Sequence, residues 1–410
     1  MRECDAGPVV RIVYLSASGR IGGAERVLLD LVASLRAAEP GWELHVVVAG
    51  AGPLADAAGA LGAIVHPLPF PAALGRTGDA GAGSGLALFL RLLAAGPAGA
   101  LWLARLRRLL RRLRPDVVHS NGFKVHVAGA LALPPGARLV WHAHDYLSVR
   151  RLMARVLRRL APRASAAIAI SRSVADDVRR VCGPGLRVEV VYNAVDLARF
   201  SPEGPRAPLD ALAGMPPAPS SPVRVGLVAT MGLWKGHDVF LRALSLLPPE
   251  LPVRGYVVGG RIYATAGSEV DPDVLRWLAA RLGITECVGF TGFVDDAAAA
   301  MRALDVVVHA STEPEPFGLV IAEAMACARP VVVSVAGGAG EIVEDGVDAL
   351  AVPPGDAEAL AVAIRRLAED VGLRARLGAA GRARAERDFD RGRLAREVAP
   401  LYRSLAGGSR

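Results

Sequence analysis

The stretch that decides the fold is residues 315–334, EPFGLVIAEAMACARPVVVS. It predicts a loop that carries Glu315, then a helix over 319–327 and a short buried strand of β-branched residues. Gly318 lets the backbone approach a ligand closely, and the first turn of the helix offers unpaired N–H groups to a phosphate. Glu315 lies just before that turn and Glu323 just over one turn beyond it. Two carboxylates on opposite sides of a bound phosphate suit the hydroxyl groups of a nucleotide sugar.

This segment resembles the E-x7-E signature of retaining glycosyltransferases of family 4 (GT4), which have the GT-B fold. In that family the first glutamate holds the donor sugar and the second holds the ribose, so the resemblance implies these roles for Glu315 and Glu323. The further donor-binding residues that it implies around the helix start are Phe317, Gly318, Leu319 and Val320. Taken in isolation, the first glutamate reads as a solvated loop charge and the second as a polar-face helix residue.

Length and composition indicate a globular protein of two domains. A chain of 410 residues exceeds one ordinary core and suggests two domains of roughly 200 residues each. The cysteines show no C-x-x-C pairing, which argues against a disulfide framework or a zinc site and favours the cytoplasm. We expect no signal peptide at the start, and no membrane span in 86–103, which Arg91 and Gly96-Pro97 interrupt. The cysteines are Cys4, Cys182, Cys287 and Cys327.

The basic charge is concentrated in the first half of the chain. The net charge is +8, and the excess of arginine lies in residues 1–200. In 102–114 and 150–163, leucines recur at helical spacing and arginines take the other positions. Such helices can lie on an anionic membrane, which would suit an enzyme that uses a lipid-linked acceptor, or can pack on the sheet with solvated arginines. The sequence leaves both open, so the expected location is cytoplasmic, with peripheral attachment to the inner face of the plasma membrane as an option. No nucleic acid partner is expected, because aromatic residues do not interleave with the arginines.

Short apolar strands alternate with helices along both halves, which predicts two doubly wound α/β domains of Rossmann-like type. The expected domains are 1–200 on the acceptor side, a Pro-rich linker at 201–222, 223–385 for the nucleotide sugar, and a helix at 386–410 that can cross back. The expected strands are 9–15, 43–48, 63–67, 116–119, 137–141, 166–170, 188–191, 223–228, 254–258, 287–290, 306–309 and 331–334. The main expected helices are 24–37, 236–247, 319–327, 357–369, 373–387 and 391–405. In the GT-B fold that the resemblance implies, the two domains face each other across a cleft.

Two features of the first half are candidates for the site. Gly22 and Gly23 follow the first strand and open a helix, where exposed N–H groups can meet an anion. An ordinary strand-to-helix turn explains them equally well, but the resemblance implies that they face the donor phosphates and the acceptor. In LVWHAHDYLS, the resemblance implies that His144 contacts the donor sugar. His142 is then either the true match or a packed core residue, and Asp145 can orient the ring.

The second half supplies a cation. Lys235 lies between a strand and a helix, where its ammonium can neutralise a leaving diphosphate, although a surface lysine at a helix start is the plainer alternative. The matching GT4 segment reads G-R-L-x-x-x-K-G, and Thr230 stands where its arginine aligns. A hydroxyl can donate to a phosphate oxygen but brings no charge. Gly337-Gly338 and Glu341 resemble a G-G-x-x-E-I-V loop that lies beside the donor site in the family.

Together these features predict a retaining glycosyltransferase that uses a nucleotide-diphospho-sugar. The acceptor, which is a glycan, a lipid-linked molecule or a small molecule, would attack from the side on which the diphosphate leaves. Lys235 and the Gly318 helix end would neutralise charge, while Glu315 and His144 would position the sugar. No His/Cys cluster is present, so we expect no metal and no cofactor beyond the nucleotide-sugar co-substrate. Two alternatives stay open: a GT-B nucleotide-sugar epimerase, and a non-catalytic sugar-nucleotide-binding relative, which Thr230 motivates.

Overall fold

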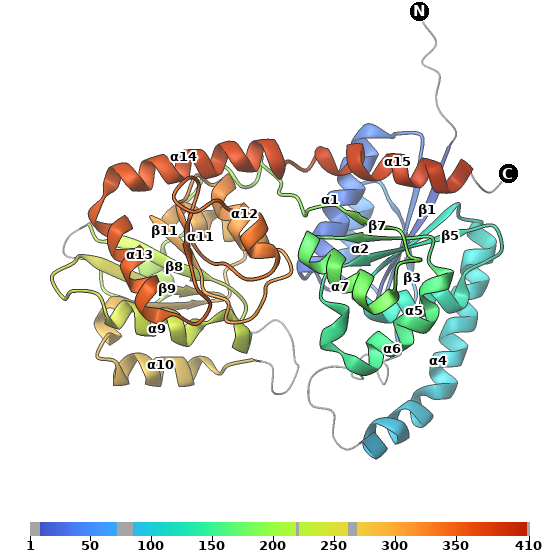
Figure 1. The fold of residues 1–410 in the computed structure, drawn as a ribbon, viewed down its shortest axis with the longest axis horizontal. Helices are drawn as coiled ribbons and strands as arrows, with labels where there is room; N and C mark the ends of the chain where they lie inside the picture. Colours follow the sequence, from blue (N-terminus) through green and yellow to red (C-terminus); the bar gives the residue numbers. More distant parts are fainter. Residues whose placement is uncertain (1–8, 72–84, 219–220, 261–268, 408–410) are drawn as a thin grey trace, which may run out of the picture. The chain divides into compact units, whose positions relative to one another are not determined.

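The chain folds into two compact α/β units. The structure, a computed structural model, describes residues 9–71, 85–218, 221–260 and 269–407 (Figure 1). Unit 1 comprises Met1–Ala194 and Arg391–Arg410, and unit 2 comprises Val195–Asp390. Each unit is built on one parallel sheet, which confirms the predicted pair of doubly wound, Rossmann-like domains. The predictions that concern Cys4, the first eight residues and the side chains of 85–95 lie outside the described residues.

In the described part of unit 1 the sheet has the strand order β3-β2-β1-β4-β5-β6-β7. The strands are β1 (Arg11–Ser16), β2 (Glu43–Val48), β3 (Ile64–Pro67), β4 (Val117–Asn121), β5 (Arg138–Ala143), β6 (Ala166–Ala169) and β7 (Val188–Val190). The central strands are covered on both faces, so they are apolar throughout and do not alternate. The strand order reverses between β1 and β4, where Ser16 pairs with Asn121. Ligands bind beside the carboxyl ends of the strands at such a switch point.

The helices of unit 1 pack on both faces of this sheet, and the last of them comes from the end of the chain. They are α1 (Gly23–Ala38), α2 (Pro53–Ala60), α4 (Gly85–Leu113), α5 (Phe123–Ala132), α6 (Arg151–Leu160), α7 (Arg172–Cys182) and α15 (Arg393–Gly407), with the 3-10 turns η1 (Leu147–Val149) and η2 (Ala161–Arg163). Helix α15 packs against α1 (Figure 1), and the Ala395 N–H donates to Ser34 Oγ at 2.9 Å. Tyr402 is fully buried in the core of unit 1. The C-terminal helix is therefore part of this core.

In the described part of unit 2 the sheet has the strand order β10-β9-β8-β11-β12-β13. The strands are β8 (Val223–Val228), β9 (Val253–Val258), β10 (Val288–Gly292), β11 (Val306–His309), β12 (Val331–Ser334) and β13 (Leu350–Val352). The order reverses between β8 and β11, which pair in parallel from Val306 to Val308. The loops that follow these two strands therefore lie side by side at the second switch point.

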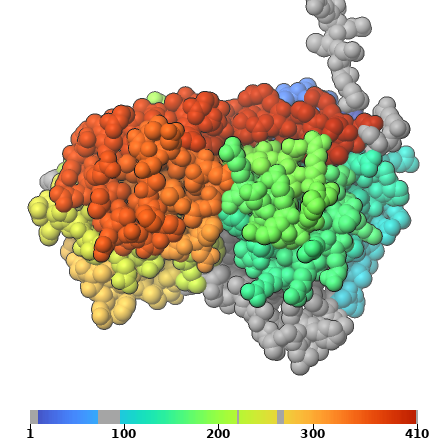
Figure 2. Space-filling model, in the orientation of Figure 1, coloured from blue at the N-terminus to red at the C-terminus, as the bar shows by residue number. Residues whose placement is uncertain are grey.

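The helices of unit 2 include the one that was predicted to hold a phosphate. They are α8 (Leu209–Leu212), α9 (His237–Ser245), α10 (Pro272–Arg281), α11 (Ala297–Ala303), α12 (Leu319–Ala326), α13 (Ala357–Glu369) and α14 (Val371–Asp388), with the 3-10 turns η3 (Leu233–Lys235), η4 (Thr285–Cys287) and η5 (Gly338–Glu341). Figure 2 shows α13 and α14 on the surface of unit 2, in orange to red. Helix α14 packs closely on α12 and on the turn that follows it. A Cβ at Gly381 would lie 3.2 Å from Met325 Cγ, and one at Gly378 would lie 2.5 Å from the Ala328 carbonyl oxygen.

The Pro-rich segment 201–222 is held to unit 2 by polar contacts. The Asp210 carboxylate accepts hydrogen bonds from Arg224 at 2.9 Å, from Arg254 at 2.7 Å and from the Tyr256 hydroxyl at 2.6 Å. The guanidinium of Arg302 donates to the Pro205 carbonyl at 2.7 Å. These contacts give a fixed course to a segment whose composition is typical of a linker.

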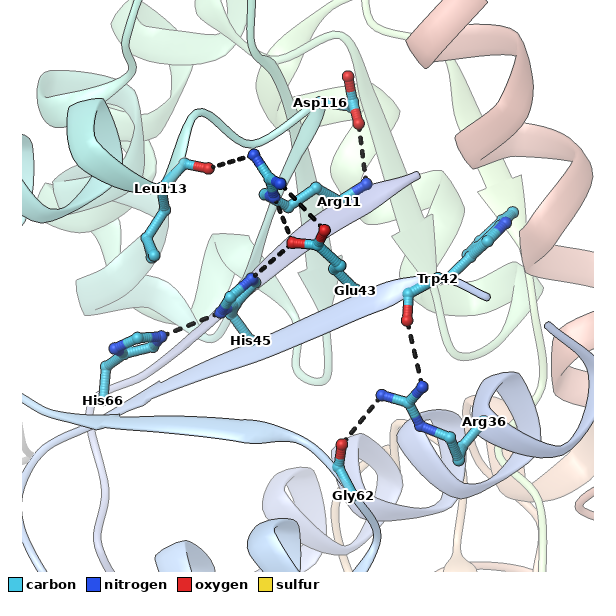
Figure 3. A network of polar contacts seen from close by, with 9 residues as sticks. All are labelled: Arg11, Arg36, Trp42, Glu43, His45, Gly62, His66, Leu113 and Asp116. Carbon is cyan, nitrogen blue, oxygen red and sulfur yellow. Dashed lines mark hydrogen bonds and ion pairs between the residues drawn. The ribbon is translucent and has the colours of Figure 1, made fainter. Parts of the chain in front are cut away.

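A polar network ties the amino ends of the unit 1 strands together (Figure 3). The Arg11 guanidinium donates to both carboxylate oxygens of Glu43 at 2.6 and 3.0 Å, and the Arg11 backbone N–H donates to Asp116 at 2.8 Å. The His45 ring lies 3.5 Å from Glu43 and 3.0 Å from the ring of His66. The network links β1, β2, β3 and the residue before β4 at the edge opposite the carboxyl ends of the strands.

The two arginine-rich helices differ in how they pack. In α4 the apolar residues Trp102, Leu106 and Leu110 are buried in unit 1, and the arginines between them are exposed. In α6 only Leu157 is buried, and Leu152 is 53% exposed. Within the residues that the structure describes, no helix is both long and apolar enough to cross a membrane.

Candidate functional site

The centre of the candidate site in unit 2 is an ion pair between Lys235 and Glu315. Lys235 Nζ donates to the two carboxylate oxygens of Glu315 at 2.9 and 2.7 Å. The side chains are 19% and 13% exposed, respectively. The Ser311 hydroxyl donates to the same carboxylate at 2.8 Å, and the His309 ring lies 3.5 Å from it. Burial alone would raise the pKa of Glu315, but the Lys235 ammonium and the His309 ring outweigh it and hold the pKa well below its ordinary value.

Backbone contacts between neighbouring loops bring this pair together. Lys235 ends η3, which follows β8, and Glu315 lies in the loop after β11. The next residue, Gly236, has φ +69°, and a Cβ there would lie 1.9 Å from the Ala310 carbonyl oxygen. Only glycine permits that approach. The Thr312 N–H also donates to the Trp234 carbonyl at 2.8 Å, so the two loops form one rigid edge.

The loop 337–338 holds the backbone of Glu315 from its other side. The Gly338 N–H donates to the Glu315 carbonyl at 2.7 Å, and the Glu315 N–H donates to the Ala336 carbonyl at 3.1 Å. This loop is the Gly337-Gly338 segment that was singled out from the sequence, and it leads into η5, which contains Glu341. The carboxylate therefore projects from a backbone fixed on both sides.

Helix α12 begins beside Glu315, as the sequence predicts. Gly318 precedes the helix with φ +94°, a left-handed conformation that favours glycine. Leu319 and Val320 form the first turn and are half-buried. The Phe317 ring is fully buried and packs against Phe389 with ring centroids 5.8 Å apart. The Phe317 side chain therefore anchors the loop in the core, so Phe317 can contact a ligand only through its backbone.

The remaining residues that were predicted for unit 2 lie on either side of this centre. Glu323 is half-buried on α12, just over one turn from its start. Thr230 is half-buried in the loop after β8, on the same switch-point loop as Lys235. The structure thus brings Lys235, Glu315 and the start of α12 into one site, with Thr230 and Glu323 on the elements that form it.

In unit 1, His144 joins a hydrogen-bonded chain at the carboxyl ends of the strands. His144 follows β5, and its Nε2 lies 2.5 Å from Oδ1 of Asn121, the last residue of β4. Asn121 Nδ2 donates to the Ala24 carbonyl in the first turn of α1 at 3.1 Å. Burial lowers the pKa of His144 to about 3, so the ring is neutral at physiological pH. The predicted histidine and the predicted glycine loop are therefore connected through Asn121.

The Gly22-Gly23 loop is shaped by the acidic residue that follows it. Gly22 precedes α1 and Gly23 is its first residue. The Gly22 N–H donates to the Glu25 carboxylate at 3.2 Å, and the Ser16 hydroxyl donates to the same carboxylate at 3.4 Å. Burial raises the pKa of Glu25, although these hydrogen bonds work in the opposite sense. One of the N–H groups expected to meet an anion is thus already paired with a carboxylate.

His142 lies in a cluster of buried rings behind His144. The two rings have centroids 4.1 Å apart, and His142 Nδ1 lies 3.2 Å from His119 Nε2. His119 Nδ1 in turn is 2.7 Å from the Tyr402 hydroxyl on α15. Burial lowers the pKa of His119 to about 3 and that of His142 well below its ordinary value. His142 is 3% exposed, so it packs in the core, which was one of the two roles left open by the sequence.

The sequence alone did not single out three further polar residues: Asn121 beside His144 in unit 1, and His309 and Ser311 beside Glu315 in unit 2. Each lies at or just after the carboxyl end of a strand next to a switch point, and that position was the available signal. Within the described ranges, no group of three or more His, Cys, Asp and Glu side chains is arranged to hold a metal ion.

The chain is similar to glycosyltransferases over most of its length. Residues 222–370 match the family model described as Glycosyl transferases group 1, and residues 21–199 match the one described as Glycosyltransferase Family 4. A D-inositol 3-phosphate glycosyltransferase of Streptomyces bingchenggensis is 35% identical over 249 residues, which cover 59% of this chain and 53% of that protein. A glycogen synthase of Mycobacterium tuberculosis (strain ATCC 25618 / H37Rv) is 30% identical over 314 residues, which cover 73% of this chain and 71% of that protein. The chain thus spans about half the length of the first of these relatives.

A solved structure shares the fold over almost the whole chain. The crystal structure of the Anabaena protein HepE in complex with UDP and glucose superimposes with a TM-score of 0.78 at 28% identity. The superposition covers 96% of this chain and 100% of that one. Both units described above therefore have counterparts in a protein whose crystals contain a nucleoside diphosphate and a sugar.

Proposed function

Because this chain belongs to the group 1 glycosyltransferases of glycosyltransferase family 4, we propose that it transfers a sugar from a nucleotide-diphospho-sugar to an acceptor hydroxyl. The observation that carries the proposal is the Lys235–Glu315 pair, which lies directly before the N-terminus of α12. A half-buried cation, a helix N-terminus and a carboxylate in one place suit a diphosphate attached to a sugar. HepE was crystallised with UDP and glucose, so UDP-glucose is the first donor to test.

The transfer retains the configuration of the anomeric carbon. The bond from that carbon to the diphosphate oxygen breaks, and the acceptor oxygen bonds to the carbon on the same face. The acceptor proton passes to the leaving phosphate oxygen, so no protein base is required. The transition state then needs positive charge beside the diphosphate, which Lys235 and the first turn of α12 can supply.

In this mechanism Lys235 exchanges partners when the donor binds. In the structure Lys235 Nζ makes two hydrogen bonds to the Glu315 carboxylate. With the diphosphate in place, Lys235 bridges the carboxylate and a phosphate oxygen, and Glu315 accepts hydrogen bonds from sugar hydroxyls. Glu323 holds the ribose from its place on α12, and Thr230 donates a neutral hydrogen bond at the position where the motif G-R-L-x-x-x-K-G has its arginine. His144 of unit 1 contacts the donor sugar.

The reaction proceeds without a metal cofactor under this proposal. The charge that a divalent cation would neutralise is met by Lys235 and the α12 dipole. Transfer rates should therefore be equal in EDTA and in added Mg²⁺ or Mn²⁺. A rate that EDTA abolishes and Mn²⁺ restores would refute this part of the mechanism.

The test is a panel of nucleotide sugars offered with glycan, lipid-linked and small-molecule acceptors. Released nucleoside diphosphate measures turnover, and NMR of the product gives the anomeric configuration. The Glu315→Ala variant should lose transfer, and full activity in that variant would refute the assigned site. Isomerisation of the donor sugar without transfer would indicate an epimerase. Donor binding without any turnover would indicate a non-catalytic relative.

The acceptor side of the enzyme lies at an anionic membrane in this proposal. Helix α6 presents exposed arginines together with the 53% exposed side chain of Leu152. The exposed arginines of this helix are Arg151, Arg155, Arg158 and Arg159. Cationic side chains next to exposed apolar ones suit the surface of a bilayer that contains anionic lipids. With α6 on the bilayer surface, the enzyme could reach an acceptor that is anchored in the membrane by its lipid.

A further inference from the structure

We propose that Asn121 is the positioning residue for His144 and fixes the imidazole tautomer that presents Nδ1 as a hydrogen-bond acceptor to a substrate hydroxyl. This inference rests on the proposed function and specifies how the sugar contact in unit 1 is made. It is carried by the chain of contacts from Ala24 through Asn121 to His144.

The orientation of the Asn121 amide follows from its two contacts. Its Nδ2 lies 3.1 Å from the carbonyl oxygen of Ala24, which can only accept a hydrogen bond. The opposite end of the amide, Oδ1, therefore faces His144 Nε2 at 2.5 Å. An amide oxygen can only accept, so the proton between these two atoms belongs to His144 Nε2.

The consequence for His144 is a single, defined tautomer. The ring is neutral at physiological pH, because burial lowers its pKa to about 3. A neutral imidazole carries one N–H, and here that N–H is on Nε2, so Nδ1 holds a lone pair. Among the residues that the structure describes, Nδ1 of His144 is buried and has no hydrogen-bond partner. Buried acceptors are normally satisfied, so this atom is the one that a substrate hydroxyl would complete.

The ring cannot readily turn to exchange its two nitrogens. The His142 ring packs against His144 with centroids 4.1 Å apart and an angle of 38° between the planes. Asn121 is 4% exposed and ends a central strand, while Ala24 lies in the first turn of α1. A single amide thus ties the histidine to the Gly22-Gly23 loop, so the loop and Nδ1 keep a constant separation.

The first test measures the tautomer directly. In ¹⁵N-labelled protein at pH 7.5, long-range ¹H–¹⁵N spectra distinguish Nε2–H from Nδ1–H, and loss of one signal set in His144→Asn assigns the ring. We expect the Nε2–H tautomer in the wild type and a mixture in Asn121→Leu, which has nearly the same size but no amide. The matched control is Ser120→Ala. It removes the 2.7 Å contact of the neighbouring β4 residue with another buried ring, His126, and should leave the His144 signals unchanged.

The second test separates positioning from a structural role. Asn121→Leu should lower kcat/KM for the donor by about 10- to 100-fold, which is the range of one lost hydrogen bond to a well-placed group. Asn121→Asp keeps an oxygen that accepts from Nε2–H, so it should preserve the tautomer, but it loses the donor to the Ala24 carbonyl and should therefore recover only part of this loss. Ser120→Ala should stay within about twofold of the wild type, as expected for a change away from the substrate.

The outcomes distinguish this inference from the proposed function. An Nδ1–H tautomer in the wild type refutes the inference even where transfer is observed. So does an Asn121→Asp variant that keeps the tautomer and is as inactive as Asn121→Leu, because the tautomer would then be irrelevant. Absence of transfer in the wild type with every donor refutes the proposed function and leaves the tautomer measurement intact. If Asn121→Leu does not fold, the wild-type spectrum and the Asn121→Asp variant still test the inference.

Discussion

Replacing Glu315 by glutamine is expected to destabilise unit 2 and abolish most transfer, yet to tighten the binding of a free nucleoside diphosphate. The three effects have one origin. The carboxylate neutralises the partly buried Lys235 ammonium in the absence of ligand, and it repels the phosphates when a ligand arrives. Glutamine keeps the size of the side chain and removes the charge.

The size of the stability effect follows from the geometry. Lys235 Nζ lies 2.7 Å from one oxygen of Glu315, and both side chains are less than one-fifth exposed. At that distance an effective dielectric constant of about 20 gives an attraction of about 6 kcal/mol, part of which is cancelled by desolvation. Removal of one partner of such a buried pair costs about 3–5 kcal/mol. Glutamine can still accept from Lys235, so we expect about 3 kcal/mol, which for a unit of this size lowers the Tm by about 6–12 °C.

The pH dependence has a definite sign. The pKa of Glu315 is lowered in the folded protein, because the Lys235 ammonium and the His309 ring outweigh the effect of burial. The stabilisation is therefore present above the unfolded pKa of about 4.3 and is lost as the pH falls through the folded pKa. Urea denaturation from pH 7 to pH 3 should show the wild type losing its advantage over Glu315→Gln below about pH 4.

Glu315→Gln should have the opposite effect on ligand binding: it loses stability but binds a nucleoside diphosphate more tightly. Without the carboxylate, Lys235 is free for the diphosphate, so calorimetry should show Kd for a nucleoside diphosphate falling by about 3- to 10-fold in Glu315→Gln, a gain of about 1 kcal/mol. Lys235→Met should raise this Kd by at least about 10-fold, because a hydrogen bond to a charged group contributes about 1.5–3 kcal/mol. The matched control is Glu313→Gln, an exposed carboxylate of the same loop, which should change neither stability nor binding.

Two results would refute the reasoning. The first is a Glu315→Gln variant with the stability and the transfer rate of the wild type. The second is a variant that loses as much affinity for the nucleoside diphosphate as Lys235→Met does, since this would mean that the carboxylate helps to hold the phosphates.

Three further predictions concern the scaffold and the surface. Gly236→Ala should destabilise the protein by more than about 1–2 kcal/mol in urea denaturation and weaken nucleoside diphosphate binding. The reason is that φ is +69° and a Cβ would collide with the Ala310 carbonyl. Stability and binding like those of the wild type would contradict the close contact between the loops after β8 and β11. Asp210→Ala should lower the free energy of unfolding by about 3 kcal/mol. Burial raises the pKa of Asp210, but its hydrogen bonds and arginine partners outweigh this and hold the pKa below the ordinary value. The stabilisation from Asp210 is therefore lost as the pH falls below about 4, and the variant should lack this pH dependence. An unchanged acid midpoint in the variant would argue against this. Arg155→Glu combined with Arg159→Glu should reduce sedimentation with vesicles that contain anionic phosphatidylglycerol at least about 10-fold and leave transfer to a soluble acceptor unchanged; equal binding to purely zwitterionic vesicles would exclude the membrane surface.

Much of the fold could be predicted because buried strands and amphipathic helices have distinct local patterns. The strands at 223–228, 306–309 and 331–334 and the helix at 357–369 have the predicted bounds. Each strand is a run of mainly apolar, β-branched residues, and such runs are covered on both faces of a parallel sheet. The apolar pattern of such a strand can be read from its own residues, whichever strand it pairs with in the sheet.

Other elements could not be predicted, or were overlooked, for identifiable reasons. Strand β13 has three residues and exists through its pairing with β12, which no local period reveals. Helix α10 had a usable signal, since Asp271 caps it and Pro272 opens it, and this signal was not recognised. The polar partners of the Pro-rich segment, above all Asp210, are distant in sequence, so its packing was not predictable from composition.

The sequence by itself determined that residues 315–334 form a loop, a helix and a strand, and that Lys235 and Glu315 both follow parallel strands. Those features depend on local composition and on the rule that such loops gather at one edge of a sheet. Tertiary structure decided that the ammonium and the carboxylate, 80 residues apart, meet at 2.7 Å. It also decided that His144 is neutral with its proton on Nε2, because tautomer and pKa depend on burial and on the direction of the Asn121 amide. Neither property is encoded near the histidine, since strand order and register bring its partners to it.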